Sequence, residues 1–360
     1  MRKSMQVIAD IVGCSRMTIS RALRNDPCVN RRTREKILSA AKKTGYNPRQ
    51  LVENSAGLSR SITVAFFNPR HDPRAQQELL SDCLRGIADE LNARRYKLAL
   101  YLFDDTYGWN KVRSGLFDGT RPDGVIFMLH VPPEIHMQFC PTMLITEAEK
   151  RRITHVQIGN ETAGSGPWNQ VYKDDQQGAW LAVNHLLKLG HRRIGFVTRE
   201  PRTYPGFQQR MAGYRQALED YHVPFNSDYV FRVKGMGLCI DSLPQVEKIL
   251  KLKPRPTALF AVADHLAINV MEALKRKGIR IPEDMAVVGY DNIPGAQAVR
   301  PALTTVDTCR EEQGRQAARL VMELINSTAR QRSARVILVP SKLVIRESCG
   351  ADKTNPPAVV

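Results

Sequence analysis

From residue 61 onward, short apolar runs alternate with longer segments of helical periodicity. The runs are SITVAFF, YKLALYL, DGVIFML, RIGFVT, TALFAV and MAVVGY, and helical patterns span 76–94, 176–189, 209–220, 264–277 and 310–325. Strands that alternate with helices favour parallel sheets with helices on both faces. This part of the chain is too long for one such unit. We therefore expect an α/β core of two doubly wound parallel-sheet subdomains over 61–349, and a loose tail over 350–360.

The first sixty residues have another pattern, that of short helices. Apolar residues at positions 7, 8, 11 and 12 indicate one amphipathic helix, and Ser15 is placed to cap a second one over SRMTISRALRN. A third helix follows Asn30, and its predicted apolar face consists of Ile37, Leu38, Ala40 and Ala41. We expect a small all-α domain over 1–46 and, starting near Pro48, a linker or short helix over 47–60.

The spacing of Ala9, Gly13 and Ile19 is typical of two helices that cross closely. A small residue permits the contact, a glycine permits a left-handed turn, and a β-branched residue holds the second helix in place. The outer face of that second helix then carries Arg16, Met17, Ser20 and Arg21. Such a helix fits the major groove of DNA, with its N-terminal residues toward the base edges. An ordinary helical hairpin with a solvated basic face is the alternative.

The distribution of charge favours the DNA-binding interpretation. The formal net charge is +17, and residues 1–60 hold 13 Lys and Arg against 4 Asp and Glu, a net +9. One sixth of the chain therefore supplies about half of the excess positive charge. A basic segment of this kind indicates contact with a polyanion.

Several classes of protein are disfavoured by what the sequence lacks. Its seven cysteines are scattered, which fits reduced thiols better than a disulfide framework or a metal site. No apolar run approaches the ~18 residues of a membrane span, and Asp10 interrupts the apolar stretch near the N-terminus, so we expect a cytoplasmic protein. No HExxH, GxSxG or Walker motif occurs, so we assign no catalytic residue, metal or cofactor.

Three segments near the N-terminus carry a family resemblance: IADIVGCSRMTISRAL, VNRRTREKI and GYNP. Residues 5–57 resemble the DNA-binding head of the lactose/galactose repressor family of bacterial transcription regulators. Further blocks, in family order, are similar to the rest of these proteins; they are RPDGVIF, VYKDDQQGAWLAVNHLLKLGHRRIGFVT, RMAGYRQAL, IPEDMAVVGYDN, PALTTVD and LVIRES. Only residues 130–170 depart from the pattern.

The resemblance implies a helix-turn-helix head, a hinge helix, and a periplasmic-binding-protein-like core whose two subdomains clamp a small effector. It implies a bacterial, nucleoid-associated repressor that acts as a homodimer on double-stranded, pseudo-palindromic operator DNA. By the same analogy, Ser15, Arg16, Met17 and Ser20 lie on the DNA-reading helix, and Arg21 reads a base. The resemblance also assigns phosphate contacts to Asn25, Asn30 and Thr33, which have amide or hydroxyl donors.

In the core, Arg210 and Asp291 match family positions that hydrogen-bond the effector, and Asp264 matches an acidic position near the cleft. Tyr204 and Phe207 are expected to supply a stacking face. Arginine and aspartate together suit a polyol, so the resemblance implies a carbohydrate effector. The alternatives are helix capping or hinge support for the two aspartates and a solvated helix-end charge for Arg210. Ala263 stands where many members have Asn, which removes one expected contact.

The hinge departs from the family pattern at Ser55. Relatives place there a leucine that wedges into the minor groove of DNA. Serine has little apolar surface to offset an unstacking cost of a few kcal/mol per base step. We therefore expect weaker DNA bending by this protein than by its relatives.

Three functions compete at this point. The leading one is a ligand-responsive DNA-binding transcription factor. The second is a cytoplasmic solute-binding protein or sensor with a vestigial head, and the third is an enzyme on the same scaffold. The basic head disfavours the second, and the lack of any nucleophile–base pair disfavours the third.

Overall fold

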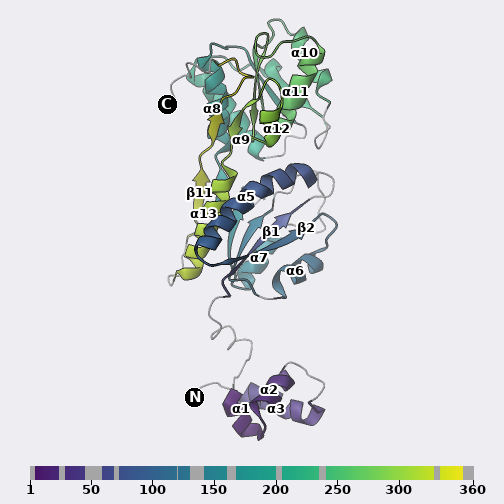
Figure 1. The fold of residues 1–360 in the computed structure, drawn as a ribbon, viewed down its shortest axis with the longest axis vertical. Coiled ribbons are helices and arrows are strands. Elements are labelled where there is room, and N and C mark those ends of the chain that lie inside the picture. The colour runs from purple at the N-terminus through teal and green to yellow at the C-terminus, as the bar shows by residue number, and fades with distance from the viewer. Residues whose placement is uncertain are drawn as a thin grey trace. The chain divides into compact units, whose positions relative to one another are not determined.

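The computed structural model describes residues 5–23, 29–44, 59–68, 73–119, 121–129, 142–159, 168–199, 205–234, 241–327 and 333–351. The chain divides into two compact units, Met1–Ser59 and Arg60–Val360, which we call the head and the core. Figure 1 shows the helices of the head and the two sheets of the core.

The described part of the head consists of three helices, α1 (Met5–Val12), α2 (Arg16–Leu23) and α3 (Arg31–Thr44). Its buried residues are Ile8, Ala9, Ile19, Ala22, Val29, Ile37, Ala40 and Ala41. Gly13 has a left-handed φ of +69°, and its N–H donates to the Ala9 carbonyl at 2.8 Å. The predicted roles of Ala9, Gly13 and Ile19 in a close helix crossing are thus confirmed.

Two apolar residues of the head were placed wrongly by the helical pattern. Ile11 is 59 % exposed and Leu38 is 49 % exposed, although both were predicted to lie on apolar helix faces. A head of this size buries only a narrow stripe on each helix, such as Ile37, Ala40 and Ala41 on α3. The neighbouring positions therefore face outward.

The first half of the core is built on sheet A, in which all the neighbouring strands are parallel. Its strand order is β11 (Val336–Val339), β5 (Gln170–Lys173), β4 (Thr154–Ile158), β3 (Gly124–Met128), β1 (Ser61–Phe67) and β2 (Lys97–Phe103). Helices α5 (Pro73–Ala93) and α13 (Arg310–Asn326) cover one face. Helices α6 (Trp109–Phe117) and α7 (Thr142–Lys150) cover the other.

The second half is built on sheet B, which is parallel except for one strand. Its order is β12 (Lys342–Val344), β10 (Thr304–Asp307), β9 (Ala286–Tyr290), β8 (Ala258–Ala261), β6 (Ile194–Arg199) and β7 (Val230–Val233), with β12 antiparallel to β10. Helices α8 (Asp175–Lys188) and α9 (Pro205–Asp220) pack on one side, and α10 (Leu243–Lys251) and α11 (Asp264–Arg276) on the other. The short helices η1 (Ser227–Tyr229) and α12 (Pro294–Ala298) complete this half.

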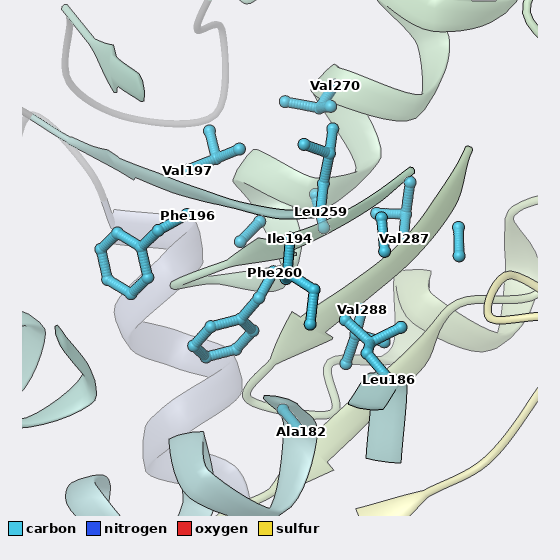
Figure 2. Packing of buried hydrophobic residues seen from close by; sticks show 14 of the residues in the cluster. Ala182, Leu186, Ile194, Phe196, Val197, Leu259, Phe260, Val270, Val287 and Val288 are labelled. Carbon is cyan, nitrogen blue, oxygen red and sulfur yellow. The ribbon is translucent and has the colours of Figure 1, made fainter. Parts of the chain in front are cut away.

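Side chains of successive residues in sheet B alternate between its two faces. Figure 2 shows Phe196 and Phe260 on the side of α8, and Val197 and Leu259 on the opposite side, toward Val270 of α11. Helices on both faces bury both sets, which explains the continuous apolar runs RIGFVT and TALFAV. The predicted fold class, two doubly wound parallel-sheet subdomains with a small all-α domain, is confirmed.

The chain passes between the two sheets three times, after β5, after β10 and after β11. Hydrogen bonds connect the crossing that follows β5 to the one that follows β11. The Asp174 N–H donates to the Val339 carbonyl at 3.2 Å, and the Ser341 N–H donates to the Gln177 side chain at 3.2 Å. Among the described residues, no helix has the length and apolar content needed to cross a bilayer. The described cysteines, Cys14, Cys83, Cys309 and Cys349, are free thiols.

Candidate functional site

The head presents α2 in the orientation that the sequence predicts. The Ser15 hydroxyl accepts from the Thr18 N–H at 3.1 Å, so α2 begins at Arg16. Because Ile19 and Ala22 are buried, the opposite face of α2 points away from α1 and α3. Met17 on that face is 65 % exposed. The side chains of Arg16, Ser20 and Arg21 lie outside the described residues, although their backbone is helical.

The start of α3 is defined by a second cap. The Asn30 side chain accepts from the Thr33 N–H at 2.8 Å, which satisfies one of the free N–H groups of the first turn. Both residues therefore lie at a helix N-terminus, a favourable place for a phosphate. Asn25 and Ser55, predicted to contact DNA, lie outside the described residues.

In the core, Arg210 is the centre of a buried polar cluster. Its side chain is 2 % exposed, and its Nε donates to Asp175 Oδ1 at 2.8 Å. Its Nη1 donates to the Val262 carbonyl, and its guanidinium carbon lies 3.7 Å from the centre of the Tyr290 ring. An arginine held in this way has a fixed orientation, because a carboxylate, a carbonyl and an aromatic face each constrain it.

Asp291 joins Arg210 to the other half of the core. Its Oδ1 lies 3.8 Å from Arg210 Nη2 and 3.1 Å from Arg310 Nη2. Arg310 Nη1 also donates to the Asp291 carbonyl at 2.7 Å. Arg310 begins α13, which packs on sheet A, whereas Asp291 follows β9 of sheet B. Asp291 therefore links the two halves through one side chain and one carbonyl.

The backbone around Asp291 is unusual. Asp291 has φ of 113° and Asn292 has φ of 52°, in a region that side-chain-bearing residues rarely adopt. Surrounding contacts hold this geometry, including a hydrogen bond from Asn292 Nδ2 to Asp307 Oδ2 at 3.0 Å and one from Arg346 Nη2 to Asn292 Oδ1 at 2.7 Å. Strained backbone of this kind is concentrated at functional sites.

Asp264 lies beneath this loop and is fully buried. Its Oδ2 accepts from the Ile293 N–H at 3.0 Å and its Oδ1 accepts from the Thr305 hydroxyl at 2.5 Å. Burial, with a contribution from the Asp291 carboxylate, raises the pKa of Asp264 to about 7. These contacts are structural ones, as in the alternative of helix capping or hinge support, and a direct effector contact by Asp264 stays a prediction.

The raised pKa predicts how stability depends on pH. The unfolded chain releases the Asp264 proton near pH 3.8, so between about pH 4 and 7 the folded protein binds more protons and loses stability as the pH rises. From pH 5 to 8 we expect the free energy of unfolding to fall by ~2 kcal/mol more in the wild type than in Asp264→Asn. Chemical denaturation at each pH measures this, with Asp82→Asn, an exposed position on α5, as the control. Equal pH profiles for Asp264→Asn and the wild type would contradict the shift.

The structure thus brings Arg210, Asp264 and Asp291 to one end of sheet B. Phe207 is adjacent, with its ring 5.6 Å from the Arg210 guanidinium carbon, whereas Tyr204 lies outside the described residues. Ala263 occupies the N-cap of α11 and makes no side-chain cap.

Three members of the cluster were not predicted: Asp175, Tyr290 and Arg310. Asp174 and Asp175 are adjacent in the sequence, and their side chains point in different directions. Asp174 caps α8 through the Gln177 N–H at 2.8 Å, while Asp175 turns inward to Arg210. The sequence offered one indication that Asp175 is buried: an acidic residue directly after a helix cap, at the start of a largely apolar helix. No described group of three His, Cys, Asp or Glu side chains is placed to share a metal ion.

Comparisons with known proteins agree with this architecture. Residues 4–49 match the family described as bacterial regulatory proteins, lacI family, and residues 183–349 match the periplasmic binding protein-like domain. The chain is 30 % identical to the NTD biosynthesis operon regulator NtdR of Bacillus subtilis, over 95 % of this chain and 98 % of the relative. It is 29 % identical to the transcriptional repressor CytR of Escherichia coli, over 97 % and 96 % of the two chains.

Solved structures share the fold. The transcriptional regulator CelR in complex with cellobiose has a TM-score of 0.65 at 23 % identity, over 96 % of this chain and 99 % of that one. The lac repressor dimer bound to operator and the anti-inducer ONPF has a TM-score of 0.62 at 21 % identity, over 96 % and 98 %. Because sequence, fold and the helix-turn-helix geometry agree along almost the whole chain, this protein belongs to the lacI family of bacterial regulatory proteins, as a transcription regulator with a DNA-binding head.

Proposed function

We propose that this protein is a cytoplasmic, homodimeric repressor whose affinity for a pseudo-palindromic operator is controlled by a carbohydrate bound beside Arg210 and Asp291. The observation that carries the proposal is the pairing of Asp291 with Arg310. It connects the strand ends of sheet B, where ligands of open α/β sheets bind, to the helix that packs on sheet A.

The polar groups at this site suit a ligand with hydroxyl groups. Asp175 Oδ2 is buried and accepts no hydrogen bond from the described residues, and the Asp291 side chain is 19 % exposed. The two carboxylates need hydrogen-bond donors, whereas Arg210 and Arg310 supply donors and need acceptors. Each hydroxyl group of a polyol both donates and accepts, so a polyol can bind to the carboxylates and to the arginines. The fold relative CelR was solved with cellobiose, which is the same chemical class.

The site also offers a route for control. A hydroxyl that takes Asp291 as its acceptor competes with Arg310, which lies at the first turn of α13. Binding then changes the pairing between the two halves of the core. A ligand shifts such an equilibrium only by its differential affinity for the two arrangements, so the contact with Asp291 is the one that carries the signal.

Dimerisation is supported by an apolar surface at the edge of sheet A. Leu98, Leu100 and Leu102 of the edge strand β2 pair with Ile62, Val64 and Phe66 of β1, so the two sets share a face. The β1 residues are buried under α5 and α13, whereas the three leucines are 37 %, 45 % and 47 % exposed. An exposed apolar edge strand of this kind is typical of a protein–protein interface.

We expect the substitution Leu100→Arg, combined with Leu102→Arg, to shift the protein from dimer toward monomer. Light scattering coupled to size-exclusion chromatography measures the molar mass in solution. At a fixed protein concentration, we expect this mass to fall from twice the 40.6 kDa of one chain toward the mass of one chain. The matched control is Leu338→Arg, which is 48 % exposed on β11 at the opposite edge of the same sheet. A double variant that stays dimeric would rule out β2 as the interface.

DNA reading is tested at Arg21, after an operator has been selected from random DNA with the full chain. If Arg21 contacts a base edge, Arg21→Ala costs ~1–3 kcal/mol on the operator and relaxes selectivity at one position. Binding to random DNA falls much less. Fluorescence anisotropy on both duplexes measures the difference, and an equal loss on both would reduce Arg21 to a phosphate contact.

A further inference from the structure

Helix α9 and the strands β6 and β7 line an open pocket of about 500 Å³, which we call the β7 pocket. Its volume lies within the range of small-molecule sites. Of the described residues predicted to bind the effector, only Phe207 lines it. Arg210, Asp264 and Asp291 are absent from its lining, so the β7 pocket is a separate feature of the sheet B half.

The register of sheet B explains how the pocket forms. Phe196 pairs with Val230 and Thr198 pairs with Arg232, so these four side chains point to one face of the sheet. That face is the side of α8, on which Figure 2 shows Phe196. Helix α9 presents residues at helical spacing to the same space, namely Phe207, Met211 and Arg215.

The walls combine aromatic surface with positive charge. Phe196, Phe207, Met211 and Phe225 line the pocket with apolar surface, and Arg215 and Arg232 are its charged residues. No acidic side chain is among the residues that line it. The pocket therefore carries two unbalanced positive charges beside apolar walls.

Arg232 has an unmet hydrogen-bonding need. Its Nε is buried and has no hydrogen-bond partner among the described residues. Leaving a buried donor unpaired costs free energy, and a carboxylate matches a guanidinium in shape and charge. The Arg215 guanidinium lies over the Phe225 ring, 4.1 Å from its centre, and such stacking leaves its N–H groups directed outward in the guanidinium plane.

We propose that the β7 pocket binds a small organic anion with an aromatic body, whose carboxylate pairs with Arg232 and whose ring lies against Phe207 and Met211. This site is additional to the carbohydrate site of the proposed function. It requires neither operator binding nor an intact contact between Asp291 and Arg310.

The probe is 2-naphthoate, with the uncharged 2-naphthamide as its isostere, titrated into the full-length protein by isothermal calorimetry. We expect the naphthoate to bind at least about tenfold more tightly than the amide, since the charge-assisted pairing supplies the difference. The substitution Arg232→Met removes that difference. Val230→Phe fills the pocket and weakens both probes. Arg276→Met, an exposed arginine on α11, changes neither.

The proposal is overturned if naphthoate fails to bind the wild type, if Arg232→Met leaves naphthoate binding unchanged, or if the two probes bind equally. Binding that survives Val230→Phe places the probe elsewhere and has the same consequence. Operator binding by the same variants is recorded in parallel, so a failure of the β7 pocket is distinguishable from a failure of the DNA-binding function.

Discussion

Replacing Arg210 with Met is expected to destabilise the core by ~3–5 kcal/mol, because it leaves the Asp175 carboxylate buried without its partner. The contact with the Tyr290 ring is lost as well. In a unit of this size the loss corresponds to a fall of ~10 °C in the melting temperature. Thermal unfolding followed by circular dichroism measures it.

The double variant Arg210→Met, Asp175→Leu distinguishes a lost ion pair from lost packing. With both charges removed, we expect the double variant to regain at least about half of the free energy of unfolding that Arg210→Met loses. An apolar pair often replaces a buried ion pair without a loss of stability. If the double variant is as unstable as Arg210→Met, the guanidinium acts mainly through Tyr290 and Val262. Unchanged stability in Arg210→Met would contradict the buried ion pair itself.

A comparable loss is expected where α5 and α13 cross, because each helix presents a glycine to the backbone of the other. A Cβ at Gly86 would lie well inside 3.0 Å of the Glu311 carbonyl oxygen, and one at Gly314 equally close to that of Cys83. Backbone atoms cannot move aside without separating the helices. We expect Gly86→Ala and Gly314→Ala each to cost ~3 kcal/mol, which is large for a single added methyl group.

Gly119→Ala is the matched control, since a Cβ there meets no atom within 4 Å. Chemical denaturation of the three variants and the wild type gives the comparison. We expect Gly119→Ala to unfold within ~0.5 kcal/mol of the wild type. The close crossing would be contradicted if Gly86→Ala and Gly314→Ala behaved like Gly119→Ala.

The sequence predicts elements best where one pattern decides the structure. β3 and β9 read as continuous apolar runs because helices cover both faces of each sheet, and the observed strands lie within the predicted ones. Strands β4, β5, β7, β10, β11 and β12 were missed, because each has at most five residues. A strand this short has no strong periodicity to detect.

The site was predicted in part, for a different physical reason. Arg210 and Asp291 were assigned to the effector site through family resemblance. In the structure, Arg210 Nη2 lies 3.8 Å from Asp291 Oδ1. Asp175 and Arg310 were missed because their partners lie 35 and 19 residues away along the chain, and no local pattern encodes such pairings. The burial of Arg210 was not predicted either, since a charged residue near a helix end is usually solvated.

The central claim is that the head recognises one DNA sequence. The most direct test is fluorescence anisotropy of the full-length protein on its selected operator and on a scrambled duplex of equal length and composition, compared first at one salt concentration and then over a salt titration. We predict that the operator binds at least ~10³-fold more tightly, as is typical of specific regulators. Affinities that agree within about threefold, with both falling steeply as salt is added, would show a purely electrostatic interaction and contradict the account.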